Sequence, residues 1–191
     1  MRPRNTIIAL VLLAVVGGYA WVQYRYMAEQ PAKKLYTITP EEIAKIHLRY
    51  PGSEIELGRE GNGTWRISKP FNVDADQTAA NNLARAVAEC EVQKTVDEKP
   101  AALAPFGLDS PQVIVTVTTK GGKTLPGIAL GKTTPVGFAV YMKTTEKPAV
   151  MLASSAFQAG MKKTLDQLRN RDLMDFKIDD VQRVTIERGG G

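Results

Sequence analysis

Alternating apolar and polar residues predict a first group of short strands. The alternation runs through residues 46–50, 55–57 and 65–67, and turn residues at 51–52 and 61–63 separate the three runs. A period of two residues puts every second side chain on the same face of a strand. Strands joined by such short turns pair in antiparallel order, with one face apolar and the other wet. We therefore expect an antiparallel meander here.

A second group of strands is predicted further along the chain. Residues 113–117 alternate valine with polar residues and lead to the glycine pair at 121–122, which predicts a hairpin turn. Apolar runs follow at 125–130, 138–142 and 150–152. In the run 138–142 the side chains that face the core are either Phe138, Val140 and Met142 or, with the opposite parity, Ala139 and Tyr141. One more short strand is expected at about 92–96.

Two apolar stripes predict a helix after each strand group. Spacings of three or four residues, typical of one helix face, relate two sets: Ala79, Leu83, Val87 and Cys90, and then Phe157, Met161, Leu165 and Leu168. Asp74 with Gln77, and Ser155 with Gln158, have the spacing of capping boxes. We therefore expect one helix to open near Asp74 and a single second helix to run from Ser155 to about Arg171.

This order of elements predicts the α+β class, with antiparallel strand groups each followed by a helix packed on one sheet face. A final strand is expected at 181–187. Residues 180–187 repeat the arrangement of acidic and aliphatic residues seen at 42–49. The repeat indicates the start of a truncated second unit, and a last strand of a single sheet is the alternative.

The N-terminal segment 5–24 predicts a transmembrane helix, because it holds 20 residues without a charge. A helix of this length spans about 30 Å, the thickness of the hydrocarbon layer. Trp21 and neighbouring tyrosines at its C-terminal end are typical of the membrane interface. Most of the hydrophobicity comes from Ile7, Ile8, Leu10, Val11, Leu12, Leu13, Val15 and Val16.

A signal peptide cleaved after Ala20 is the alternative, because Arg2 and Arg4 precede the apolar run and Gly18-Tyr19-Ala20 fits a cleavage site. The aromatic belt favours an uncleaved signal anchor instead. The charge before the helix favours an N-terminus inside, so we expect a single-pass inner-membrane protein whose C-terminal domain is periplasmic or extracellular. The expected organisation is a cytoplasmic N-terminus (1–4), a signal anchor (5–24), a stalk (25–34), an α+β domain (35–178) and a final strand (179–191).

The net charge of +5 changes little in this picture. Without Arg2, Arg4 and Arg25, which flank the apolar segment, positions 26–191 hold 22 basic and 20 acidic residues. No basic cluster is visible in the sequence, so nucleic acid is not expected as a partner. Pairs such as Lys33-Lys34 and Lys162-Lys163 are interpreted as solvated positions.

The inventory of reactive residues is small, and no catalytic, metal or cofactor residue is expected. One histidine, His47, and one cysteine, Cys90, exclude metal sites that need several imidazoles or thiolates. His47 is expected on the wet face of its strand, and Cys90 is expected to be a buried, inert thiol. Ser154-Ser155 lacks the frame of a nucleophile elbow, and Gly121-Gly122-Lys123-Thr124 lacks the first glycine of a phosphate loop.

Several landmarks together resemble the bacterial envelope family known as domain of unknown function 4340. The resemblance rests on Thr39-Pro40-Glu41-Glu42-Ile43, Trp65-Arg66-Ile67-Ser68-Lys69-Pro70, Phe106-Gly107-Leu108-Asp109-Ser110-Pro111, Leu130-Gly131 with Gly137 and Tyr141, and Leu168-Arg169-Asn170-Arg171-Asp172-Leu173 with Phe176. It implies a single-pass envelope protein, often encoded near ABC-2-type transporter and gliding-motility-like genes. It also implies that longer members carry a second similar unit. It implies no established chemistry.

The motif residues are expected mainly to serve folding, with a shared functional surface as the alternative. Such a surface would consist of Trp65, Pro70, Phe106, Gly107, Leu108, Pro111, Arg169 and Arg171. The function expected is that of a non-catalytic extracytoplasmic binding or scaffold protein, accessory to an ABC-type transporter or another envelope machine. An exported solute- or lipid-binding domain is the main alternative, and an envelope hydrolase is a weaker one.

Overall fold

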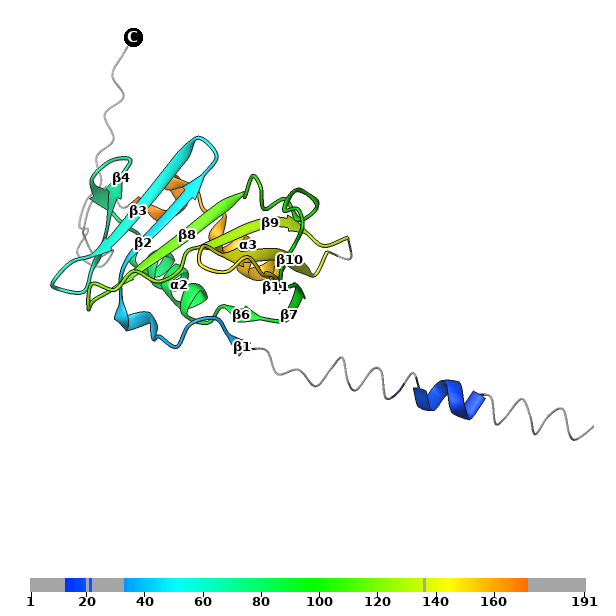
Figure 1. Ribbon diagram of the computed structural model, residues 1–191. Coiled ribbons are helices and arrows are strands. Elements are labelled where there is room, and N and C mark those ends of the chain that lie inside the picture. Colours follow the sequence, from blue (N-terminus) through cyan, green and yellow to red (C-terminus); the bar gives the residue numbers. More distant parts are fainter. Residues whose placement is uncertain (1–12, 20, 22–32, 136, 172–191) are drawn as a thin grey trace, which may run out of the picture.

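The structure is a computed structural model that describes residues 13–19, 21, 33–135 and 137–171 (Figure 1). Of the predicted anchor residues, Ile7, Ile8, Leu10, Val11 and Leu12 lie outside the described residues. The predicted final strand at 181–187 also lies outside them.

A single antiparallel sheet unites the two predicted strand groups. Among the described residues it has nine strands in the order β5-β4-β3-β2-β8-β9-β10-β11-β7. Its first half consists of β2 (Ile43–Tyr50), β3 (Ser53–Arg59), β4 (Trp65–Lys69) and β5 (Val73–Asp74). Its second half consists of β8 (Val113–Thr119), β9 (Ile128–Thr133), β10 (Ala139–Thr144), β11 (Val150–Ser154) and β7 (Lys94–Asp97).

The two halves meet where β2 pairs with β8. Ile46 lies opposite Val117 and Leu48 opposite Val115, and all four side chains are buried. The match follows from the two-residue period, because strands with the same apolar parity bury one face together. The α+β class and the antiparallel pairing are therefore as predicted, but the two groups form one layer.

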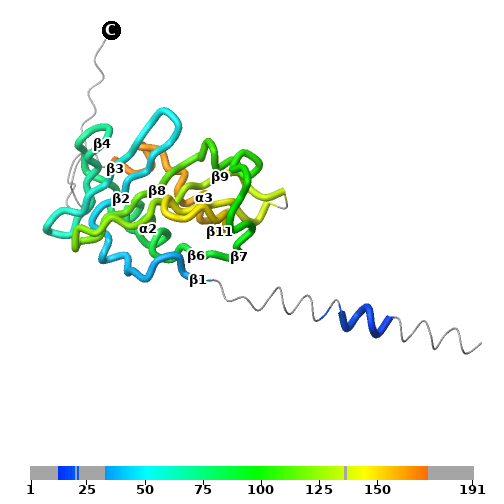
Figure 2. The backbone as a smooth tube through the Cα atoms, in the orientation of Figure 1, coloured from blue at the N-terminus to red at the C-terminus, as the bar shows by residue number. Residues whose placement is uncertain are grey.

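Three helices cover the apolar face of the sheet: α2 (Gln77–Ala88), α3 (Ser155–Met161) and α4 (Leu165–Leu168) (Figures 1 and 2). The core between the layers is aliphatic and contains the indole of Trp65, which is 1% exposed. Burial of each large apolar side chain contributes about 1.5–3 kcal/mol before the entropic cost of ordering the chain. The largest fully buried side chains of this core are Trp65, Ile43, Ile46, Leu48, Leu57, Ile67, Leu83, Ile128, Leu130, Met142, Met161 and Leu168.

The opposite face of the sheet is wet in its first half and covered in its second. The loop before β8, which contains the short 3-10 helix η2 (Ala104–Phe106), packs Leu108 against Ala129 and Val150. Phe106 meets Tyr141 edge to face, with ring centroids 5.1 Å apart. This motif therefore builds a second small core on the outer side of the sheet.

The helix starts differ from the prediction. The N-cap of α2 is Asp76, whose carboxylate accepts the Ala79 N–H at 2.9 Å, while Asp74 belongs to β5 and binds Arg66. The N-cap of α3 is Ser154, whose hydroxyl oxygen accepts the Ala156 N–H at 3.1 Å. Each place offers two candidate caps, Asp74 and Asp76 before α2 and Ser154 and Ser155 before α3, and the end of the preceding strand decides which of them is used.

The predicted second helix is in fact two short helices. α3 ends at Met161, and Thr164 then caps α4 in a capping box with Gln167. Gln158, predicted to cap the helix, is buried and donates instead to the Gly131 carbonyl at 3.0 Å. Met161 and Leu168 therefore reach the core from two separate helices, which the spacing alone does not reveal.

The domain begins earlier than predicted. Lys33–Lys34, assigned to the stalk, forms β1, which pairs with β6 (Glu91–Val92) in a separate two-stranded sheet. The predicted strand at 92–96 is likewise divided, because β6 pairs with β1 and β7 pairs with β11. The predicted hairpin at 121–122 is confirmed, with Gly122 at a φ of 77°.

Candidate functional site

A groove of about 720 Å³ lies where the chain enters the domain. Its lining includes Leu35, Tyr36 and Ile38 from the entering chain and Leu125 and Pro126 from the segment before β9. The Tyr36 hydroxyl donates to the Pro126 carbonyl and closes the floor. Burial raises the pKa of this phenol far above its usual range. The groove therefore has an apolar floor that is held by a neutral tyrosine.

A second groove of about 690 Å³ adjoins the first and shares Leu35, Lys147 and Met151 with it. Its lining holds one glutamate, Glu98, and several lysines that belong to three separate parts of the chain. We call these lysines the basal lysine surface, and they are Lys33, Lys34, Lys94, Lys99 and Lys147. All five are exposed.

This cluster is not apparent in the sequence, because its lysines come from three segments that are far apart along the chain. Pairing of β1 with β6 brings Lys33 opposite Val92, and pairing of β7 with β11 brings Lys94 opposite Leu152. Lys147 comes from the loop before β11. The fold therefore gathers lysines that the sequence shows only as separate pairs and single residues.

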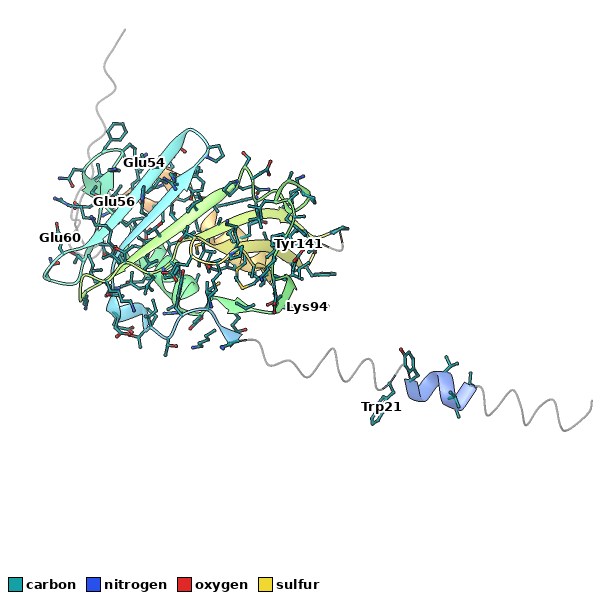
Figure 3. The ribbon with its side chains drawn as sticks, in the orientation of Figure 1. Trp21, Glu54, Glu56, Glu60, Lys94 and Tyr141 are labelled. Carbon is teal, nitrogen blue, oxygen red and sulfur yellow. The ribbon has the colours of Figure 1, made fainter. Side chains whose placement is uncertain are left out.

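A second polar cluster lies on the wet face of β2, β3 and β4. Glu54 contacts two side chains, His47 through Nε2 at 2.8 Å and Lys69 through Nζ at 2.9 Å. Glu56 contacts Lys45 Nζ at 3.1 Å and accepts the Ser68 hydroxyl at 2.9 Å. Figure 3 shows Glu54, Glu56 and Glu60 at this end of the sheet, and Lys94 at the end that carries β1. His47 is thus on the predicted face, with a carboxylate partner that the sequence did not reveal.

The chemistry of this polar cluster is that of an ion-pair network. The hydrogen bonds from Lys69 and His47 hold the pKa of Glu54 below its ordinary value. A carboxylate with a lowered pKa is a poor general base. The imidazole forms a hydrogen bond with Glu54, and no serine, threonine or cysteine of the described chain is bonded to it.

Cys90 lies in the core beyond the end of α2 and is 2% exposed. Burial, followed by the nearby Glu91 carboxylate, raises the pKa of its thiol to about 12. It is therefore a thiol and not a thiolate at neutral pH, as expected for a packing residue. Within the described residues, no three His, Cys, Asp or Glu side chains gather closely enough to hold a metal ion.

The family motif residues do not form one surface. Trp65 and Leu108 are core residues, on opposite sides of the sheet. Pro70, which follows a cis peptide bond, lines a third groove of about 520 Å³ beside Tyr50 and Leu165. Folding roles therefore account for Trp65 and Leu108.

The remaining motif residues also have structural partners. Gly107 has a φ of 67°, in the left-handed region, and ends η2. Arg169 and Arg171 both contact Asp166, with nitrogen–oxygen distances of 2.8 and 3.7 Å. Pro111 is half-buried just before β8.

Part of the predicted anchor is described. Residues 13–19 are helical, and the side chains of Leu13, Val15, Val16, Tyr19 and Trp21 are 61–72% exposed. Among the described residues there is no helix that is both long and apolar enough to cross a membrane.

Comparison with known families matches the part of the chain from residue 65 onwards. The family described as domain of unknown function (DUF4340) matches residues 65–191, from the start of β4 to the end of the chain. The chain belongs to this family. The match begins at Trp65, so the Thr39–Ile43 landmark, the N-terminal segment and β1 lie outside it. No curated protein and no solved structure matches the chain.

Proposed function

We propose that this protein is a membrane-anchored, extracytoplasmic, non-catalytic binding or scaffold protein, accessory to an ABC-type transporter or another envelope machine. The observation that carries the proposal is the uncharged 20-residue segment 5–24, which precedes a folded domain with grooves at the end where the chain enters. A segment of this length and hydrophobicity is the expected signature of a membrane helix.

The exposed apolar side chains of residues 13–19 support the anchor. Leu13, Val15 and Val16 each expose more than 60% of their surface. Exposed apolar area of this kind is unfavourable in water and is relieved when lipid covers it. Trp21, at the end of the segment, has the amphipathic ring typical of the membrane interface.

The arrangement of reactive groups supports a binding role. His47 is held by Glu54, and Cys90 is buried with a raised pKa. A hydrolytic site needs a nucleophile beside a base that a third group orients. The described residues offer no such set around either side chain.

The mechanism that we propose is positional. An anchor confines the domain to the membrane surface, where its effective concentration towards another membrane protein is far higher than in solution. A domain used in this way needs docking surfaces and no reaction centre. The two grooves beside β1 are the surfaces that such an anchor holds closest to the membrane.

Three measurements test the anchor and the partner. Full-length protein should stay with the membrane pellet after an alkaline carbonate wash, whereas a peripheral protein is released. A C-terminal alkaline phosphatase fusion should be active and a C-terminal green fluorescent protein fusion exported by the same route should be dark. Recovery of a transporter subunit after gentle-detergent purification supports the accessory role; release by the wash, or a cytosolic C-terminus, contradicts the proposal.

A second candidate function is supported by the groove over Tyr36. Its apolar floor and volume of about 720 Å³ are within the range of small-molecule sites. In this alternative the segment is cleaved after Ala20, and the exported domain carries a solute or lipid. The intact mass of the mature protein decides the cleavage, and native mass spectrometry detects a retained ligand. An uncleaved N-terminus with no bound small molecule excludes this candidate.

A further inference from the structure

We infer that the basal lysine surface binds anionic lipid headgroups and so fixes the orientation of the domain on the membrane. The inference rests on the proposed anchor, because the anchor brings the surface to the membrane. It adds a ligand class, the phosphate-bearing headgroups of acidic phospholipids, and a site, the groove between β1, β7 and the loop before β11.

The position of this surface in the chain is the first argument. β1 is the first strand of the domain, and Lys33 is separated from Tyr24 by the eight residues 25–32. Eight residues span at most about 29 Å even when fully extended. The lysines of β1 are therefore held within about one bilayer thickness of the membrane surface.

The electrostatic argument concerns unpaired charge. None of the five lysines has a carboxylate within 4.0 Å of its ammonium group in the part of the chain that the structure describes, and Glu98 is the one acidic residue that lines their groove. Glu91 lies opposite Lys34 in the β1–β6 pair but does not line the groove. The adjoining groove adds Lys120 and Lys123 with Glu42 and Glu146. Together the two grooves hold seven lysines and three glutamates.

The contrast with the other end of the sheet sharpens this argument. There, Lys45 and Lys69 have carboxylate partners at 3.1 and 2.9 Å, and Arg66 contacts Asp74 at 2.6 Å. Cations that already have internal partners are less available to a ligand. Of the 14 described lysines and arginines without a carboxylate within 4.0 Å, seven line these two grooves, where the anchor joins the domain.

The residue type and the shape of the surface favour lipid over a protein partner. The cations that line both grooves are lysines, and arginine is absent from the described lining. Lysine attracts phosphate as a compact point charge without fixed geometry, whereas arginine is the usual choice for oriented, bidentate contacts at protein interfaces. Leu35, Val92 and Met151 provide an apolar floor between the ammonium groups. Such a mixture suits the boundary between headgroups and acyl chains.

The test uses the full chain in vesicles of two compositions: phosphatidylcholine alone, and phosphatidylcholine with roughly 30% phosphatidylglycerol. A water-soluble amine reagent labels exposed lysines, and mass spectrometry gives a rate for each. We expect the five basal lysines to react about threefold more slowly in the anionic vesicles, with unchanged rates for Lys132 and Lys162. Salt at about 0.5 M should restore the labelling rates. At this concentration the Debye length is only a few ångströms, so the attraction between the lysines and the headgroups is screened.

Charge variants provide the matched control. Lys33→Gln, Lys94→Gln and Lys99→Gln together should abolish the protection of the remaining basal lysines. Lys132→Gln, Lys143→Gln and Lys162→Gln remove the same charge from outside both grooves and should leave the protection intact. Equal labelling rates in both vesicle types would overturn the inference and leave an acidic protein as the partner class.

The outcome for the anchor is read separately. If the chain fails to stay in phosphatidylcholine vesicles after an alkaline wash, the proposed anchor is wrong, whatever the labelling shows. If it stays in those vesicles but the labelling rates do not depend on lipid charge, the anchor stands and the lipid-binding surface is wrong. If the released chain floats with anionic vesicles and not with neutral ones, the lipid-binding surface stands although the anchor is wrong.

Discussion

The backbone carbonyl of Phe106 lies directly against Gly131, where the loop before β8 crosses β9. A Cβ atom at position 131 would overlap the Phe106 oxygen and lie 3.1 Å from both the carbonyl carbon and the oxygen of Gly107. Gln158 donates to the Gly131 carbonyl from the helical side of the sheet. The loop before β8 and helix α3 thus both contact β9 at a residue without a side chain.

Gly131→Ala should therefore destabilise the fold by about 3 kcal/mol, because backbone atoms must move to admit the methyl group. Gly58→Ala is the matched control, since a Cβ there meets nothing within 4 Å. It should change the free energy of unfolding by less than about 1 kcal/mol. Urea unfolding measures both variants. Equal stability of the two variants would mean that the loop does not rest on β9 in this way.

Tyr50→Phe should lower stability by about 1–2 kcal/mol, because one hydroxyl serves two backbone groups. The Tyr50 hydroxyl donates to the Met161 carbonyl at 2.7 Å and accepts the Lys163 N–H at 3.1 Å, which holds the break between α3 and α4. Tyr141→Phe keeps the ring contact with Phe106 and removes a hydroxyl that has no hydrogen bond to another described residue. It should change the midpoint of thermal unfolding little, and a larger loss for Tyr141→Phe than for Tyr50→Phe would refute this assignment.

The Glu54 network predicts a specific loss of stability in acid. Its pKa lies below the ordinary value of 4.5, because Lys69 and then His47 bond to the carboxylate. The folded state thus binds the proton less tightly than the unfolded chain does, so the stabilisation is present above pH 4.5 and is lost as the pH falls through the lowered pKa. Glu54→Gln cannot titrate and should show a shallower decline of Tm between about pH 6 and about pH 3.

The control for this prediction is Glu41→Gln, because Glu41 has no ion pair with another described residue. Its decline of Tm should match that of the unaltered protein. In addition, Lys69→Gln should raise the pKa of Glu54 in an NMR titration by more than His47→Gln does, since the Lys69 bond has the larger effect. The reverse order would show that the imidazole is the main partner.

Cys90 should resist modification in the folded protein. With a pKa of about 12 and 2% exposure, its thiol should react with a maleimide at about pH 8 at least a hundredfold more slowly than in the denatured chain. The same burial predicts that no disulfide-linked dimer forms under mild oxidation. Rapid labelling of the native protein, or a dimer lost on addition of reductant, would show that α2 opens readily at its C-terminal end.

The pairings within the first meander and the turn after β8 were predictable, because these antiparallel neighbours are close in sequence and share a two-residue period. The meander of β2, β3 and β4 and the hairpin at Gly121-Gly122 follow from residues that are only a few positions apart. Local spacing does not choose between adjacent capping residues, and therefore Asp76 and Ser154 replaced the expected caps. It also does not show that Thr164 begins a new helix.

Three features are already evident without the fold: the uncharged N-terminal segment, the alternation that builds the sheet and the scarcity of reactive side chains. Each of them depends on composition or on a short-range period. Which charges meet, in contrast, depends on how the strands pair. Lys33, Lys94 and Lys147 become neighbours through the pairings of β1 with β6 and of β7 with β11, and His47 gains Glu54 through the pairing of β2 with β3. Electrostatic energy depends on distance in space, and strand pairing makes that distance independent of separation along the chain.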